Sequence, residues 1–217
     1  MGKMKNIKTP IFAIDFEGSK NIGIVEYGVA EIFGGRIRSC ATRICAPKTA
    51  ITPADAKFFD ISDARARQNP PFIDDILSFC DMRKRGIFAA HNAVAEDTML
   101  RDALPVAPPT FDELTGKTCA SWSPFIDTCV LSKKLFGLKS SKLSDVVNAL
   151  GLTAELDARA AEFCPTDRRK WHCALYDAIA CALILIKICS FDGFENVSQL
   201  WLLKHSNPTV STQETFL

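Results

Sequence analysis

The sequence has no long hydrophobic run, no excess of one charge and no internal repeat. Its longest apolar run, 178–186, has nine residues, whereas a helix that crosses a bilayer needs roughly 20. Lys and Arg number 26 and Asp and Glu number 25, which gives a net charge of +1, so the chain as a whole does not attract polyanions or anionic membranes. We therefore predict no membrane association, and we expect any nucleic-acid binding to depend on local basic clusters.

Signals for secretion and for disulfide bonding are also missing. The basic first ten residues lead into only five apolar residues before Asp15, too few for the apolar part of a signal peptide. The nine cysteines are odd in number and include no Cys-x-x-Cys pair. We therefore expect a cytoplasmic protein whose cysteines are small, mostly buried hydrophobic residues. A zinc site at Cys164, His172 and Cys173 is disfavoured, because this spacing matches no common zinc motif.

What is present is the composition of one ordinary globular domain: 217 residues, of which 47% are hydrophobic and 24% charged. Strands are predicted at 11–14, 22–33, 36–45, 87–90 and 125–127. Helices are predicted at 70–85, 94–104, 130–136, 143–150, 156–163 and 171–189. Three strands followed by alternating helices and strands indicate an α/β domain. We assign it to residues 1–190, followed by a C-terminal helix and tail, 191–217. The segment 105–124 holds four prolines and is predicted to be a functional or mobile loop.

Two carboxylates close the first predicted strand, in the sequence Asp15-Phe16-Glu17-Gly18. Side chains alternate along a strand, so Asp15 and Glu17 share one face while Phe16 takes the other. Open α/β sheets place ligands at the carboxyl ends of their central strands. A pair of charges beside a buried apolar run is costly unless it has a partner, and this favours a functional role over a solvated face.

Two further polar groups stand at helix starts. His91-Asn92 precedes Glu96 and Asp97 at a step from strand to helix, and His172 precedes Asp177 by five residues. Five residues on a regular helix turn the direction by roughly 140°, so these two side chains converge only if His172 lies outside the helix. Asp177 falls among small apolar residues of the predicted helix, where a carboxylate without a partner is unfavourable.

Together and in this order, the three groups resemble the DEDDh class of 3′–5′ exonucleases, which includes the proofreading (epsilon) subunit of bacterial DNA polymerase III. The resemblance covers roughly residues 11–190 and extends to Asp127-Thr128. It implies a ribonuclease-H-like fold, in which a five-stranded mixed sheet with an antiparallel second strand carries helices on both faces. It also implies a 3′–5′ exonuclease acting on single-stranded nucleic-acid 3′ ends, with DNA favoured as the substrate.

The resemblance assigns roles to individual residues. Two Mg²⁺ or Mn²⁺ ions, which prefer oxygen ligands, would be held by Asp15, Glu17, Asp177 and an acid of the second group. His172 would be the general base, because an imidazole exchanges protons near neutral pH. The usual Thr after the catalytic Glu is replaced here by Gly18-Ser19, so the contact to the substrate's 3′-hydroxyl would use backbone N–H groups or Ser19. His91 and Asn92 are the remaining residues of the motif and are assigned to substrate binding.

Which acid of the second group binds metal is open between Glu96 and Asp97. An alignment without gaps selects Glu96, and a slip of one residue selects Asp97. On a helix, Glu96 lies over the apolar stripe of Met99, Leu100, Ala103 and Leu104, whereas Asp97 lies about 90° away from it. Asp97 also has Arg101 four residues on, which predicts a surface ion pair. We favour Glu96.

Most basic clusters are predicted to be solvated helix faces. Arg168-Arg169-Lys170 is the exception, because it immediately precedes His172 and is predicted to contact substrate phosphates. Trp122 and Phe125 could stack on bases, but packing in the core is favoured.

Alternatives remain for substrate and partner. The enzyme could trim RNA 3′ ends instead of DNA, or the fold could serve as a non-catalytic binding module. The last five residues, Gln213-Glu214-Thr215-Phe216-Leu217, are similar to the short peptides with which replication proteins bind a sliding clamp. A DNA polymerase or a clamp is therefore a candidate partner. The similar segment 199–203 has the apolar spacing of a packed helix.

Overall fold

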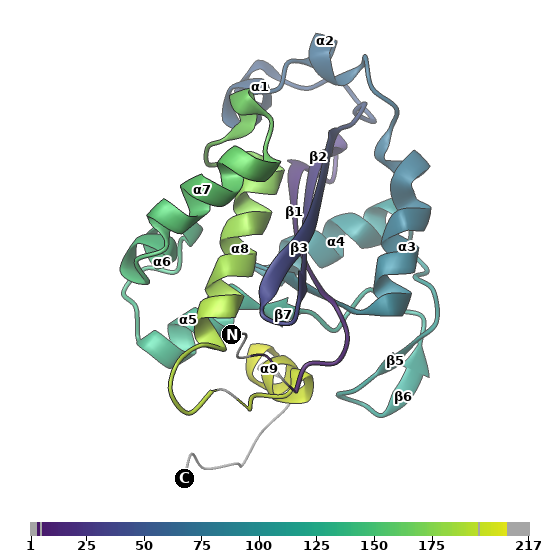
Figure 1. The fold of residues 1–217 in the computed structure, drawn as a ribbon. Helices are drawn as coiled ribbons and strands as arrows, with labels where there is room; N and C mark the ends of the chain where they lie inside the picture. The colour runs from purple at the N-terminus through teal and green to yellow at the C-terminus, as the bar shows by residue number, and fades with distance from the viewer. Residues whose placement is uncertain (1–3, 5, 195, 208–217) are drawn as a thin grey trace.

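The computed structural model describes residues 4, 6–194 and 196–207, and its centre is a mixed five-stranded sheet (Figure 1). The order across the sheet is β3-β2-β1-β4-β7. β2 is antiparallel to β1 and β3, whereas β4 is parallel to β1 and β7 is parallel to β4. The strands are β1 (Ile11–Ser19), β2 (Gly23–Phe33), β3 (Arg36–Ile44), β4 (Ile87–Ala90) and β7 (Ile126–Asp127). The predicted α/β class and the antiparallel second strand are confirmed.

Helices cover both faces of the sheet (Figure 1). One face carries α5 (Thr128–Phe136), α6 (Leu143–Ala149), α7 (Thr153–Phe163), α8 (Ala174–Ile188) and α9 (Gln199–Ser206). The other carries η1 (Phe72–Asp75), α3 (Ile76–Arg85) and α4 (Ala93–Ala103). Along β1 the side chains alternate between these two cores: Ile11 and Ala13 pack toward α8, while Phe12, Ile14 and Phe16 pack toward α3 and α4. A continuous apolar strand with helices on both sides is what such alternation requires.

α8 packs directly on the sheet because both surfaces are made of small residues. Gly28 of β2 has no side chain at the point where α8 begins, and a Cβ there would lie 2.2 Å from the carbonyl carbon of Ala174. Ala178, Cys181 and Ala182 continue the contact, and all three are buried. The predicted row of small residues on this helix therefore lies against the sheet.

Several elements differ from the predictions. α1 (Pro53–Phe59) and α2 (Asp63–Ala66) were not expected, because each has a single buried residue and shows little periodicity. Both are capped by hydroxyl side chains, and together they form a third apolar cluster with the β1–β2 turn. The 105–124 loop contains a short hairpin, β5 (Thr110–Asp112) and β6 (Lys117–Cys119), which turns at Gly116. A one-turn 3-10 helix, η2 (Thr166–Arg168), precedes the loop that leads into α8.

The segment after residue 190 packs on the same body in its described part. Leu202 and Leu203 of α9 are fully buried in the larger core cluster, and the Asn207 side chain donates a hydrogen bond to the carbonyl of Phe125. The packed helix predicted at 199–203 is confirmed, whereas the clamp-like peptide 213–217 lies outside the described residues. None of the helices in the described part of the chain combines the length and apolar character needed to cross a bilayer.

Candidate active site

The carboxyl end of β1 supplies two acidic side chains on the face that α8 covers. Glu17 is buried and Asp15 is partly buried, while Phe16 points to the opposite core and packs against Phe72 and Phe79. The β1–β2 register shifts between Glu17 and Gly18, so the strand bends immediately after the second acid. The alternation predicted from the sequence therefore holds at this position.

The start of α8 brings a third acid and a histidine to the same place. His172 lies two residues before the helix with a φ of 61°, in the left-handed region that non-glycine residues rarely adopt. This confirms that it stands outside helical geometry. Its backbone N–H donates to Asp177 Oδ2 at 3.2 Å. One ligand atom from each of Glu17, His172 and Asp177 lies within 4.8 Å of the others.

Glu96 of α4 completes the group of buried acids. Its side chain is 5% exposed, and Glu96 Oε2 and Asp177 Oδ1 are buried oxygens that have no hydrogen-bond partner among the described residues. Asp97, by contrast, pairs with Arg101 at 2.6 Å and accepts a hydrogen bond from Ser123. The predicted ion pair of Asp97 is confirmed, and the acid that faces the other carboxylates is Glu96.

These carboxylates raise one another's pKa. Burial, followed by repulsion from Glu26, raises the pKa of Asp15 to about 7. Burial and the charges of Asp15 and Asp177 raise the pKa of Glu17 to about 10. Burial and the charge of Asp15 also raise the pKa values of Glu96 and Asp177. A cluster that holds protons so strongly in the absence of a cation is suited to bind one.

The donor set fits hard divalent cations. Buried oxygens without partners are unfavourable unless something compensates them, and bound metal ions would supply that compensation for Glu96 Oε2 and Asp177 Oδ1. Mg²⁺ and Mn²⁺ prefer carboxylate oxygens, and Cys ligands suit other metals. The nine cysteines are all free thiols, and the metal-ligand group found among the described residues contains none of them.

Glu26 of β2 is a buried residue of this site that sequence reasoning missed. It accepts two hydrogen bonds from Arg168, at 2.9 and 2.5 Å, and one from the backbone N–H of Ala174 at the start of α8. Both side chains of the ion pair are at most 3% exposed. The partners lie 142 residues apart in the chain, and no local pattern indicates such a pair.

This pair corrects the predicted phosphate contacts at 168–170. Arg168 is buried, and its remaining donor binds the carbonyls of Phe59 and Asp60, so it cannot reach a substrate phosphate. Arg169 donates to the carbonyls of Ala161 and Cys164 at the end of α7. Lys170 pairs with Asp60 at 2.6 Å. The cluster is basic because it holds the loop before α8, a role that spacing alone does not distinguish from phosphate binding.

His91, Asn92 and Asp127 set the position of α4. Asp127 accepts hydrogen bonds from the N–H groups of Asn92 and Ala93, and also caps the start of α5. Asn92 adopts a left-handed conformation just before α4. The His91 ring lies between Thr128 Oγ1 at 3.0 Å and the carbonyl of Ser141 at 2.8 Å, and burial lowers its pKa. In this structure His91 and Asn92 therefore connect the start of α4 to α5 and to the α5–α6 loop, at the edge of the site.

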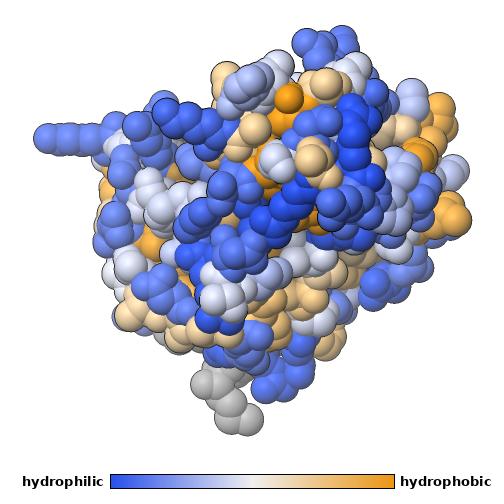
Figure 2. Space-filling model, turned by 90° about the horizontal axis from the view of Figure 1, so that it is seen from above, coloured by the Kyte–Doolittle hydropathy of each residue, from blue (hydrophilic) through white to orange (hydrophobic). Residues whose placement is uncertain are grey.

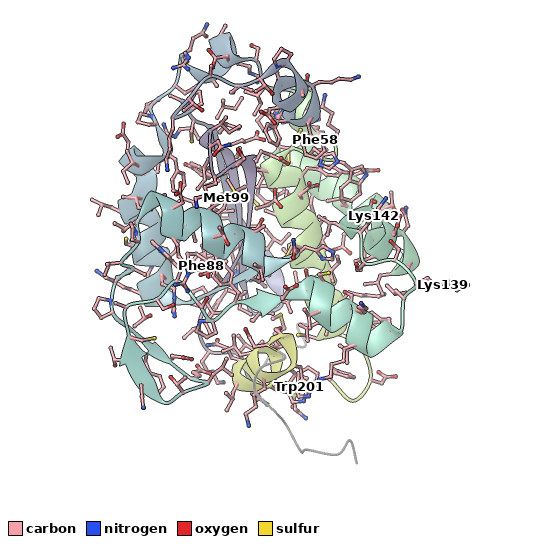
Figure 3. The ribbon with its side chains drawn as sticks, turned by 180° about the vertical axis from the view of Figure 1, so that it is seen from behind. Phe58, Phe88, Met99, Lys139, Lys142 and Trp201 are labelled. Atoms are coloured by element: carbon pink, nitrogen blue, oxygen red, sulfur yellow. The ribbon has the colours of Figure 1, made fainter. Side chains whose placement is uncertain are left out.

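Ser19 lines a pocket of about 190 Å³. Gly18 lies next to this pocket, because a Cβ at Gly18 would meet Gly23 and Met99, which line it. A side chain at Gly18 would lie 2.1 Å from the Gly23 carbonyl oxygen, so this backbone must stay bare. Ser19, Gly23, Phe72 and Met99 are among the residues that line the pocket. Met99 is labelled in Figure 3, where it lies on α4 beside the central strands.

Burial decides the role of the two aromatic residues that were candidates for stacking on bases. Trp122 and Phe125 are 1% and 3% exposed and pack in the core with Phe88, which confirms the favoured prediction. Seen from the end that carries α1 and α2, the surface is largely hydrophilic with small apolar patches (Figure 2).

Comparison with known proteins supports the fold. No protein-family model matches the sequence, and no curated protein matches it. Solved structures do resemble it. Exonuclease X in complex with 5′-overhanging duplex DNA is 22% identical with a TM-score of 0.59, over 88% of this chain and 98% of that one. A 3′-exonuclease that recognises the histone mRNA stem-loop is 15% identical with a TM-score of 0.64, over 86% of this chain. E. coli exonuclease I with a dT13 oligonucleotide is 11% identical with a TM-score of 0.61, over 84% of this chain.

The chain spans 65% of the stem-loop exonuclease structure and 41% of the exonuclease I structure. At these levels of identity the likeness establishes the fold: a five-stranded mixed sheet with helices on both faces, as in ribonuclease-H-like proteins. The fold predicted from the motifs is confirmed.

Proposed function

We propose that this protein is a metal-dependent 3′–5′ exonuclease of the DEDDh type. The observation that carries the proposal is the group of Glu17, His172 and Asp177, whose ligand atoms lie within 4.8 Å of one another. The charge of Asp15 acts on both Glu96 and Asp177, and each of these two acids has a buried oxygen without a partner among the described residues. A purely structural cluster would satisfy these oxygens with hydrogen bonds. The similarity to three exonuclease structures supports the same reaction class.

Asp15, Glu17, Glu96 and Asp177 would hold two divalent ions. When bound, these ions would neutralise charge on the entering and leaving oxygens of the phosphodiester. The protein's own contribution is to hold four carboxylates close together in spite of their repulsion, between the helices that pack on the two faces of the sheet. Glu96 has one methylene more than the Asp usual at this position, and its carboxylate reaches the group from the first turn of α4.

His172 would accept a proton from the attacking water at one of its ring nitrogens. The side chain is exposed, so water can reach it, and a ligand atom of its ring lies within 4.8 Å of Glu17 and Asp177 oxygens. A general base must be within hydrogen-bond reach of the water it deprotonates. No other histidine competes for the role, because His91 is engaged by Thr128 and Ser141 and His205 belongs to α9.

The 3′ end of the substrate would enter beside Gly18 and Ser19. The adjoining pocket, lined by Ser19, Gly23 and Met99, offers space for the terminal nucleoside. Phosphates farther along the strand would meet Lys139 and Lys142 in the α5–α6 loop. Both are exposed, and no salt bridge in the described part of the chain involves either. The His91–Ser141 contact ties this loop to the end of β4, at the same edge of the sheet as the acids.

The substrate can be DNA or RNA. The neighbours include exonuclease structures with DNA and one with an mRNA stem-loop, and DNA remains our favoured substrate. A DNA polymerase or a sliding clamp as partner, and with it a proofreading role, is a prediction from the motif resemblance. A cytoplasmic location is likewise a prediction.

The deciding experiment uses 5′-labelled single strands of DNA and of RNA with the same sequence, with and without Mg²⁺ or Mn²⁺. We expect a ladder of products shortened from the 3′ end that requires the metal and disappears in Asp15→Asn. A strand whose 3′-hydroxyl is blocked by phosphate controls for the direction of attack. Intact DNA and RNA under all metal conditions, with binding retained, would favour the non-catalytic module instead.

A further inference from the structure

His172 has an unusual neighbour on α1, the short helix that the sequence did not predict. The Phe58 and His172 rings have centroids 4.3 Å apart, with a tilt of 42° between their planes. Phe58 is 56% exposed, whereas the next residue, Phe59, is buried in the cluster under α1. Single exposed Phe side chains are common on protein surfaces. Phe58 differs because its ring contacts the candidate general base. Figure 3 labels Phe58 at the top of the molecule, above α8.

Hydrogen bonds and an ion pair connect the end of α1 to the loop that carries His172. Arg168 donates to the carbonyls of Phe59 and Asp60, and Lys170 pairs with the Asp60 carboxylate. Glu26 in turn holds Arg168 and the N–H of Ala174 at the start of α8. The backbone on both sides of the ring pair is thus fixed by buried and surface contacts, so the position of Phe58 relative to His172 is determined by the fold.

The imidazole itself has little else to orient it. His172 is exposed, and among the described residues only its backbone N–H, not its ring, makes a hydrogen bond. General bases are commonly held by a third group that bonds to the second ring nitrogen. Here the contact that restricts the ring is the face of a phenyl group.

We infer that Phe58 is a positioning residue for His172: its ring holds the imidazole in the orientation that faces Glu17 and Asp177. The inference rests on the proposed function, since it assigns a partner to the proposed base. It differs from a role in substrate binding, in which the exposed Phe58 ring would stack on a nucleobase. The two roles predict different kinetics.

A double-mutant cycle separates these roles. Wild type, Phe58→Ala, His172→Ala and the double variant are compared in single-turnover cleavage of a 5′-labelled oligonucleotide with saturating metal. We expect Phe58→Ala to lower the maximal rate about tenfold with the oligonucleotide Kd unchanged, because small misplacements of a catalytic group cost rate. In the His172→Ala background the same change should have less than about a twofold effect, because there is no imidazole left to orient. Phe58→Tyr, which keeps the ring, should restore the rate.

A second readout does not depend on activity. The chain has three histidines, so the His172 ring protons can be assigned in NMR spectra by their loss in His172→Ala. The Phe58 ring should shift these resonances in the metal-free protein, and Phe58→Ala should remove the shift while Phe111→Ala, which changes another exposed Phe on β5, should not.

Four results would overturn the inference. Equal losses of rate in both backgrounds, or a loss confined to Kd, would assign Phe58 to substrate stacking. Unchanged His172 resonances in Phe58→Ala would show that the rings are not in contact. A shift without any nuclease activity in the wild type would refute the proposed function and, with it, the catalytic meaning of the ring contact.

Discussion

Gly28 lies directly opposite Asp15 in the β1–β2 ladder, and its missing side chain is what allows α8 to begin there. A Cβ at Gly28 would lie 2.2 Å from the carbonyl carbon and oxygen of Ala174 and 2.3 Å from the nitrogen of Leu175. The same turn of α8 carries Asp177. The close approach of this helix to the sheet therefore brings an acid of α8 next to an acid of β1.

Gly28→Ala should accordingly damage stability and metal binding together. Overpacking of this kind costs about 1–3 kcal/mol, and the relief available is to move α8 and Asp177 away from Asp15. We expect a lower melting temperature and a smaller rise of that temperature with Mg²⁺. Gly137→Asn is the matched control, because its left-handed site is open and Asn tolerates that conformation. A Gly28→Ala protein with the full response to Mg²⁺ would contradict the link.

Glu96→Gln and Asp97→Asn test which acid of α4 binds metal. Each change removes a charge and nearly keeps the shape. Glu96 is buried with an oxygen that has no partner among the described residues, so Glu96→Gln should lower turnover by about a hundredfold or more, as loss of electrostatic stabilisation at a catalytic centre does. Asp97→Asn removes an i, i+4 pair with Arg101, worth about 0.3–0.5 kcal/mol, and should stay within about twofold of the wild-type rate. Loss of turnover in Asp97→Asn alone would identify the slipped register as correct.

Both the fold and this acid are largely predictable from the sequence, for a local reason. Side chains alternate along a strand and repeat every 3.6 residues on a helix, so the facing of Asp15, Glu17 and Glu96 follows from their immediate neighbours. The position of His172 outside α8 also follows from local spacing, because two residues five positions apart on one regular helix point in different directions. α1 escapes the same reasoning, because Phe59 is its one buried residue and its sequence therefore shows no apolar period.

The misassignment of Arg168 has the opposite origin. Its partner Glu26 comes from β2, and its two carbonyl acceptors come from the end of α1. All of these contacts are distant in the chain. A buried arginine and a phosphate-binding arginine look alike in sequence, since either can stand in a basic cluster just before the proposed general base. The difference lies in burial, which only tertiary packing determines.

Replacing one partner of the Glu26–Arg168 pair should destabilise the folded protein more than replacing both partners. Arg168→Met leaves the Glu26 carboxylate buried beside Asp15, and loss of one partner of a buried pair costs about 3–5 kcal/mol. The double variant Glu26→Gln, Arg168→Met leaves no unpaired charge and should recover part of that loss in the free energy of unfolding, measured by urea denaturation. Arg65→Met is the surface control, because Arg65 pairs with Asp167 and both side chains of this pair are exposed. A double variant no more stable than Arg168→Met would show that the pair is not coupled.

The stability of the metal-free protein should fall as the pH rises above neutral. The pKa of Glu17 is raised from 4.5 to about 10 and that of Asp15 from 3.8 to about 7, so the folded state keeps protons that the unfolded chain has released. Stability therefore decreases with pH between the unfolded and folded pKa values, which starts near 4 and continues through 7 toward 10. The range above pH 7 avoids His91, whose lowered pKa affects stability in acid.

The measurement is urea denaturation at pH 7, 8 and 9, in EDTA and in Mg²⁺. We expect the free energy of unfolding to fall with pH in EDTA and to change much less in Mg²⁺, because the bound ion keeps the carboxylates charged and adds stability by mass action. Glu17→Gln should flatten the EDTA series, while Asp97→Asn should not. A wild-type stability that is constant from pH 7 to 9 without metal would contradict the repulsion between these acids.

Lys139 and Lys142 belong to the α5–α6 loop, a basic segment that the His91–Ser141 contact ties to this edge of the sheet. Figure 3 shows both lysines along one side of the molecule, below Phe58. A lysine that neutralises one phosphate of a single strand contributes about 0.7 to the slope of log K against log salt concentration. In the non-cleaving Asp15→Asn background, Lys139→Ala with Lys142→Ala should therefore weaken oligonucleotide binding at low salt and reduce that slope by about 1.4.

Lys117→Ala is the matched control, because this lysine is exposed on β6 of the outlying hairpin. It should leave both the affinity and the slope unchanged. Since phosphate contacts do not depend on the base, the loss in the double variant should be equal for dT and dA strands. If the slope keeps its wild-type value in the double variant, or falls equally in Lys117→Ala, the substrate phosphates do not contact the α5–α6 loop. The contact between His91 and Ser141 would then serve only to hold the loop.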